Sequence, residues 1–187
     1  MQKKQITPGE IRQCISNILQ FIGEDVNREG LQDTPDRVLR SYTELFSGYN
    51  IDLEEIFRAK FADVQSFSDV ILLRDIEFTS MCEHHMLPFE GSVDIAYLPN
   101  SLVLGVSKLA RIVDCFSKRL QIQEKMTSQI GNAIQDFLSP QGVAVRVRAK
   151  HYCMVMRGVQ KKRSVMETYH YTGSFLQDKA SFLNLLF

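Results

Sequence analysis

One stretch of the sequence alternates so regularly that it constrains the whole fold. The segment VAVRVRAKHYCMV, residues 143–155, places apolar and basic side chains at alternating positions. Val143, Val145 and Val147 fall on one face, and Arg146, Arg148 and Lys150 on the other. Because successive side chains of a strand point to opposite faces, this pattern predicts a β-strand with one apolar face. The chain must therefore supply further strands and a layer to cover that face.

The other segments predict those partners in a definite order. Thr-Pro pairs at positions 7 and 34 are helix start signals, and they begin the predicted helices 7–23 and 34–48. Strand patterns and a helix pair follow along the chain, at 69–80, 91–99, 107–120, 121–138, 143–155 and 162–174. Two strand pairs separated by a helix pair predict an α+β fold, with an antiparallel sheet and helices packed on one face.

Charge is unevenly distributed along this chain, whose formal net charge is zero. Residues 1–103 carry nine Lys/Arg and seventeen Asp/Glu, whereas residues 104–163 carry twelve and three. The basic part indicates an anionic ligand, and the alternatives are acidic-on-basic subunit packing or ordinary solvated faces.

Composition and cysteine usage favour a cytoplasmic location. Hydrophobic residues make up 44% of the chain, enough for a core. No apolar run reaches the length of a membrane span, and the N-terminal MQKKQITPGEIRQ lacks the apolar stretch of a signal peptide. The four cysteines lack a disulfide-framework spacing, so we expect reduced thiols.

The most unusual cluster of the sequence is TSMCEHHMLPFEG, residues 79–91. Cys82 and His85 have the two-residue gap that lets a tight turn hold one zinc. Cys153 is predicted to lie at the end of the strand 143–155, where His151 shares its face. Three ligands leave one tetrahedral position open, which is typical of catalytic rather than structural zinc. A closed site would recruit a fourth ligand, and the candidates are His84, His151, His170 and Cys115. Cys115 and Cys14 instead fit apolar helical positions.

A second candidate site gathers basic residues in the same half of the chain. Ser107 is a suitable N-cap for the helix 107–120, and helix N-termini bind phosphate through free N–H groups. Lys108 and Arg111 share a face near that end, and Arg157 follows Cys153 by four residues. Together they predict a polyphosphate site beside the metal. The alternative is a capped helix with ordinary surface charges.

Three motifs together resemble one known family. TSMCEHHMLPFEG, GVSKLARIVDCFSKRLQIQEKMTSQI and HYCMVMRGVQ occur in the order found in GTP cyclohydrolase I, the entry enzyme of pterin and folate biosynthesis. The resemblance implies a tunnelling fold: a four-stranded antiparallel sheet with two helices on one face, residues 67–187, after an N-terminal helical extension, residues 1–66. It also implies a cytoplasmic homodecamer of two pentameric rings, with neither nucleic acid nor membrane as a partner.

The resemblance also assigns roles to residues. Zinc ligands fall on Cys82, His85 and Cys153, and catalytic histidines on His84 and His151. Substrate contacts fall on Glu124 and Gln123 for guanine and on Ser107, Lys108, Arg111, Arg157 and Arg37 for the triphosphate. The implied reaction converts GTP and water to formate and 7,8-dihydroneopterin triphosphate. His151 is our candidate acid at purine N7, and His84 our candidate proton shuttle.

One segment departs from the family pattern. After RGVQ the family usually has a strand of alternating threonines, whereas this chain reads KKRSVMETYHYTGSF with Met166, Glu167, Tyr169 and His170. The change bears on the reaction rate and on subunit assembly rather than on the class of reaction.

Two alternative functions are compatible with the resemblance. One is a deazaguanine nitrile reductase of the same fold, and the other is a non-catalytic pterin- or nucleotide-binding relative. The reductase needs no zinc, so the full Cys-His-Cys set argues against it; the intact histidines and Glu124 argue against the second.

Overall fold

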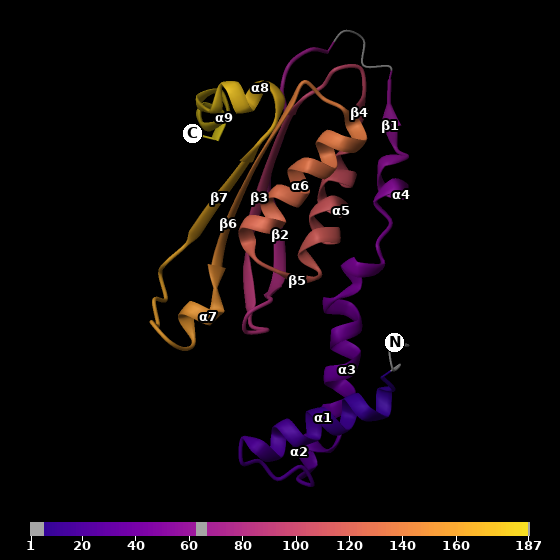
Figure 1. Ribbon diagram of the computed structural model, residues 1–187, viewed down its shortest axis with the longest axis vertical. Helices are drawn as coiled ribbons and strands as arrows, with labels where there is room; N and C mark the ends of the chain where they lie inside the picture. Colours follow the sequence, from indigo (N-terminus) through magenta and orange to yellow (C-terminus); the bar gives the residue numbers. More distant parts are fainter. Residues whose placement is uncertain (1–5, 63–66, 187) are drawn as a thin grey trace, which may run out of the picture. The chain divides into compact units, whose positions relative to one another are not determined.

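The computed structural model describes residues 6–62 and 67–186, and Figure 1 traces the chain. The chain divides into two compact units, residues 1–47 and 48–187. The predicted domain boundary after residue 66 stays a prediction, although Ile56 and Phe57, which precede it, belong to the core of the second unit.

The N-terminal unit consists of three helices. They are α1 (Pro8–Phe21), α2 (Glu29–Gln32) and α3 (Thr34–Leu45). Thr7 is the N-cap of α1, which begins at the predicted Thr-Pro pair, and it forms a capping box with Glu10. Arg12 of α1 pairs with Asp36 of α3 at 2.6 Å. Neither α1 nor α3 has a fully buried residue among those described, and their apolar side chains are half-buried or exposed.

The second unit is built on a five-stranded sheet with the order β5-β2-β3-β6-β7. Four strands are antiparallel: β2 (Ile71–Cys82), β3 (Pro88–Leu98), β6 (Gly142–His151) and β7 (Met166–Tyr171). The fifth, β5 (Leu120–Gln121), pairs parallel to the end of β2. The predicted α+β class is confirmed, but the predicted count of four strands omits β5, since two residues carry no alternation that sequence analysis can detect.

Two long helices cover one face of this sheet, as Figure 1 shows. They are α5 (Val106–Ser117) and α6 (Gln123–Leu138), and their apolar faces bury Val93, Val145 and Val147. The apolar face of β6 is therefore buried as predicted, whereas Arg146 on the other face is also buried, where it pairs with Asp94. Around this layer lie η1 (Ser47–Asn50), α4 (Leu53–Phe57), and the pair β1 (Lys60–Phe61) and β4 (Val103–Leu104).

The opposite face of the sheet is also covered in part, which corrects the prediction of helices on one face only. The helices α8 (Gly173–Gln177) and α9 (Lys179–Leu186) follow β7. Phe175 and Phe182 pack there against Ala96 and Ala144, small residues that leave room for aromatic rings. Among the described residues, no helix is long and apolar enough to cross a membrane.

Candidate functional site

The ends of three strands meet where the predicted metal ligands lie. Cys82 ends β2, and the turn that carries His85 leads directly into β3. His151 ends β6 and is the register partner of Phe89 near the start of β3. This register brings the chain after β6 beside the turn after β2.

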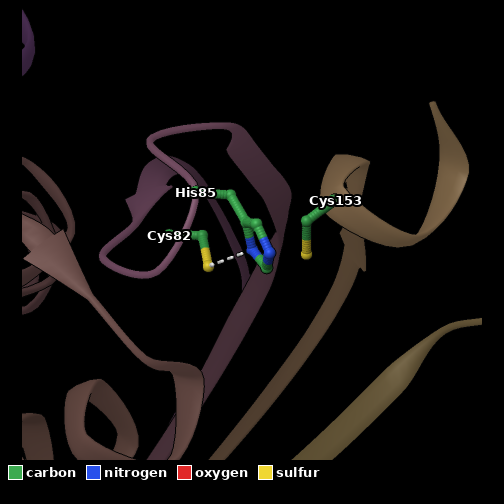
Figure 2. Close-up of side chains that lie close together, drawn as sticks. All are labelled: Cys82, His85 and Cys153. Atoms are coloured by element: carbon green, nitrogen blue, oxygen red, sulfur yellow. Dashed lines mark hydrogen bonds between the residues drawn. The ribbon is translucent and has the colours of Figure 1, made fainter. Parts of the chain in front are cut away.

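Cys82, His85 and Cys153 form one group whose candidate ligand atoms all lie within 4.8 Å of one another. Figure 2 shows the His85 ring between the two sulfur atoms, with Nδ1 4.0 Å from the Cys82 Sγ. Cys153 lies in the short helix α7 (Tyr152–Val155), not on the strand as predicted, because β6 ends at His151. The predicted set is brought together, although the argument from a shared strand face was wrong.

The turn itself is held by backbone hydrogen bonds. The N–H of Cys82 donates to the Leu87 carbonyl at 2.9 Å, and the N–H of Met86 donates to the Cys82 carbonyl at 2.8 Å. Met86 takes a positive φ of 51°, a conformation that costs energy for a residue with a side chain. The N–H of Glu83 donates to Gln121 of β5, so this short strand anchors the turn.

The donor set fits zinc. Zinc binds thiolate sulfur at about 2.3 Å and imidazole nitrogen at about 2.0 Å, so tetrahedral ligand atoms lie roughly 3.5 Å apart. The candidate ligand atoms lie within 4.8 Å of one another, so their separations exceed the tetrahedral value by at most about 1.3 Å. Burial, and then the neighbouring Cys82, raise the pKa of the Cys153 thiol. Two adjacent thiols are costly to ionise together, and a bound cation offsets that cost.

His151 lies beside this group but is held differently. Its ring stacks on the buried Phe89 at a centroid distance of 4.7 Å, and its Nε2 lies 2.7 Å from the Gln123 Oε1. Burial lowers the pKa of His151, and the nearby Glu124 carboxylate partly opposes that shift. Glu124 occupies the first turn of α6 with an exposed side chain. His84 is exposed and does not join the metal group, and its ring centroid lies 6.4 Å from that of the adjacent His85.

The predicted anion contacts do not all gather at this site within one chain. Arg157 does lie there, with Nη1 2.9 Å from the His85 Nε2. Lys108 and Arg111 line an open cavity of about 580 Å³ with Asp52 and Arg58. The cavity runs along α5, because Asp114 and Lys118 near the end of the helix also line it. Ser107 and Lys108 lie in the first turn of α5, whereas β5, which pairs with Cys82, follows the other end, and twelve helical residues span about 18 Å.

Two predicted contacts need further comment. Ser107 is not the N-cap of α5: Gly105 takes that position with extended backbone, and Ser107 is the second helical residue. Arg37 belongs to the N-terminal unit, where it pairs with Asp33 at 3.2 Å.

The sequence analysis missed two threonines that belong to the surroundings of His151. Thr168 of β7 and Thr127 of α6 both contact Gln123. The four-residue spacing of Gln123 and Thr127 places them on one helix face, and it was the only sequence signal for this contact. Thr168 follows Gln123 by 45 residues, and no local pattern connects the two.

Comparison with known proteins identifies relatives over nearly the whole chain. The family model described as GTP cyclohydrolase I matches residues 11–186. The GTP cyclohydrolase 1 of Rickettsia felis is 58% identical over 182 residues, covering 96% of each chain. That of Rickettsia bellii is 55% identical over 188 residues, covering 99% of this chain and 98% of that protein. Among solved structures, the apo archaeosine synthase QueF-Like is 19% identical with a TM-score of 0.45, covering 56% of this chain and 94% of that one.

Proposed function

The chain belongs to the GTP cyclohydrolase I family and is an enzyme that acts on GTP, and from this premise we propose how its residues perform the reaction. The products are formate and 7,8-dihydroneopterin triphosphate, the latter a pterin precursor of tetrahydrofolate. The observation that carries the proposal is the convergence of Cys82, His85 and Cys153 within 4.8 Å. We assign the sheet with α5 and α6 to the tunnelling fold.

Cys82, His85 and Cys153 hold zinc in this proposal. Two thiolates select zinc over magnesium or calcium, which prefer oxygen ligands. When bound, zinc supplies a Lewis acid with an open position for water or substrate. Three protein ligands, rather than four, suit that role. Among the described residues, no fourth His, Cys, Asp or Glu joins the group.

His151 and His84 move protons in this proposal. Hydrolytic opening of the imidazole ring of guanine needs a proton at N7 to make C8 electrophilic, and His151 delivers it. His84 is exposed beside the metal group, so it can exchange protons with both solvent and a bound intermediate. Imidazole suits both tasks because its ordinary pKa lies near neutral pH.

Glu124 recognises guanine in this proposal. Its exposed carboxylate lies near enough to His151 to influence that ring's pKa, so it borders the same space. A carboxylate can accept from N1–H and from the 2-amino group of guanine together, whereas adenine lacks both donors.

The triphosphate is held by Arg157 from the same chain and by Ser107, Lys108 and Arg111 from another copy, with Arg37 as a further contact. The support is that Ser107 and Lys108 lie in the first turn of α5, whereas β5, which pairs with Cys82, follows the opposite end of that helix. Exposed Ile18, Phe21 and Ile22 at the end of α1 also favour association. We propose a decamer of two pentameric rings in the cytoplasm, where the four free cysteines stay reduced.

Metal analysis combined with GTP turnover tests the central proposal. Wild-type protein is expected to carry about one zinc per chain and to yield a fluorescent pterin from GTP after oxidation. Cys153→Ser is expected to lose zinc and activity, whereas Cys14→Ser, which removes an exposed thiol outside the group, keeps both. Full zinc content and activity in Cys153→Ser contradict the assignment. Light scattering tests the ring, and an active monomer contradicts it.

A further inference from the structure

Gln123 is the first residue of α6, and its side chain is almost completely buried, with 1% of its surface exposed. Its Nε2 lies 3.0 Å from the carbonyl oxygens of Val147 and Met166 and 3.1 Å from the Thr168 Oγ1. Its Oε1 lies 2.7 Å from the His151 Nε2. The side-chain amide therefore connects helix α6 to strands β6 and β7 through its NH₂ group, and its oxygen contacts His151.

The carbonyl partners decide which way this amide points. A carbonyl oxygen can only accept, so the NH₂ group of Gln123 must face Val147 and Met166. Its Oε1 is then the atom that faces His151, and an amide oxygen can only accept as well. The His151 Nε2 must therefore carry a hydrogen, which defines the tautomer of the neutral ring.

The hydroxyl groups of Thr127 and Thr168 also hydrogen-bond to Gln123 and to each other. The Thr127 hydroxyl donates to the Gln123 backbone carbonyl at 2.7 Å, which uses its single hydrogen. The 2.6 Å contact between the Thr127 and Thr168 hydroxyls must then be donated by Thr168. Thr168 is left with only lone pairs for Gln123, so it too requires the NH₂ group on that side.

We propose that Gln123, oriented by Thr168 and Thr127, is a positioning residue that holds His151 as the Nε2–H tautomer and leaves Nδ1 as the reacting nitrogen. Within residues 6–62 and 67–186, the His151 Nδ1 has no hydrogen-bond partner. The sequence assigned Gln123 to substrate, but both ends of its side-chain amide are occupied inside the protein.

The proton balance of the proposed acid step fits this arrangement. The imidazolium of His151 carries hydrogens on both nitrogens and gives the Nδ1 hydrogen to purine N7. The ring that remains is the neutral Nε2–H tautomer, the form that Gln123 already stabilises. No second proton has to move through the amide, and Nδ1 regains its proton from water or substrate in a later step.

Nitrogen NMR of histidine tests the tautomer independently of turnover. The chain has four histidines, so ring-¹⁵N-labelled full-length protein gives few signals, and His151→Gln identifies that of His151. At a pH where the ring is neutral, wild-type protein is expected to show a protonated Nε2 and a bare Nδ1. Gln123→Met, which removes the acceptor, is expected to show a mixture of both tautomers. A protonated Nδ1 in wild-type protein overturns the proposal.

Substitutions at Thr168 test the hydrogen bonds that orient the Gln123 amide. They provide the test even if Gln123→Met fails to fold. Thr168→Val removes one of the three acceptors that hold the NH₂ group on this side, while the Val147 and Met166 carbonyls remain. We therefore expect a partial loss of orientation, seen as a minor second tautomer, and a fall in kcat of at most about 10-fold with KM for GTP unchanged. Thr168→Ser restores the hydroxyl and is expected to restore both readouts. Ser128→Ala is a matched control, since that hydroxyl donates only within α6, to the Lys125 carbonyl.

The outcomes separate this inference from the proposed function on which it rests. If Thr168→Val and Thr168→Ser give the same tautomer population and the same kcat, the hydrogen bond between Thr168 and Gln123 does not help to position His151. If the tautomer is as expected but His151→Ala turns over GTP normally, the acid role of His151 fails while the positioning stands.

Discussion

Arg157 places a guanidinium nitrogen 2.9 Å from Nε2 of His85, one of the three side chains that can hold a metal. A guanidinium can only donate, so the lone pair at Nε2 is occupied and the neutral ring carries its hydrogen at Nδ1. A metal also needs a lone pair on this ring. The contact with Arg157 and a metal bond therefore compete for His85, and metal binding releases the guanidinium toward an anion.

Replacing Arg157 should thus affect metal and substrate in opposite directions. We expect Arg157→Ala to bind zinc at least as tightly as wild-type protein, because a competitor for His85 is gone. We expect its KM for GTP to rise about 10-fold or more, because a charged phosphate contact is lost. Zinc competition with a chelator and steady-state kinetics measure the two effects. Loss of zinc in Arg157→Ala contradicts the competition, and Arg163→Ala serves as a control basic residue from the loop that follows.

Glu124→Gln should separate guanine recognition from folding. An amide offers one acceptor oxygen and turns a donor toward guanine, so we expect most GTP turnover to be lost, about 100-fold in kcat/KM. Zinc content and Tm should stay near wild-type values, because the side chain is exposed. Asp136→Asn, an exposed carboxylate on the same helix, should change none of these. Normal GTP kinetics in a zinc-loaded Glu124→Gln would move guanine recognition to other residues.

The sequence predicted those parts of the fold and site that repeat a local pattern. The alternation around Val145 predicted a strand that the structure contains, and the Cys82–His85 spacing predicted two residues that the structure brings together. The cap of α5 was mistaken because Gly105 and Ser107 are both good N-cap residues two positions apart. The choice between them depends on where β4 ends, which the local pattern does not show.

Long-range features were harder to predict from the sequence. Cys153 does lie with Cys82 and His85, but it belongs to α7, whose residues Tyr152–Val155 no longer alternate as residues 143–150 do. The contact of Thr168 with Gln123 depends on the register of β6 and β7, which no single segment specifies. The pairing of β5 with β2, which anchors the turn that carries His85, likewise depends on a contact between distant segments.

The buried pair of Asp94 and Arg146 should be more sensitive to single than to double substitution. Their side chains are 1% and 7% exposed and meet at 2.7 Å across β3 and β6. Asp94→Asn leaves the guanidinium charge buried without its carboxylate, so we expect about 3 kcal/mol less stability. The double variant Asp94→Leu, Arg146→Met removes both charges, although it also removes the acceptor of the Asp75 N–H, so we expect a smaller loss of about 1 kcal/mol. Denaturant unfolding at fixed chain concentration measures both, and equal losses in the single and double variants contradict this account.

His170 should make the protein less stable as the solution becomes acidic. Its ring lies on β7 against α6, where Nε2 lies 2.9 Å from the Asn132 Oδ1, and a side chain on Gly131 would collide with it. Burial lowers the pKa of His170 below its ordinary value of 6.5. Above that value the ring is neutral in both the folded and the unfolded chain, so it adds no pH dependence. As pH falls below about 6.5 the unfolded chain takes up the proton first, so stability is lost until the folded pKa is reached.

The variant His170→Gln tests this account, because glutamine can keep a donor for Asn132 without titrating. Its Tm should fall less steeply than that of wild-type protein between about pH 7 and pH 5, the range that contains the ordinary histidine pKa. His151 contributes the same slope to both proteins and cancels in the difference. Parallel Tm profiles for the two proteins would show that His170 is not held neutral by the fold.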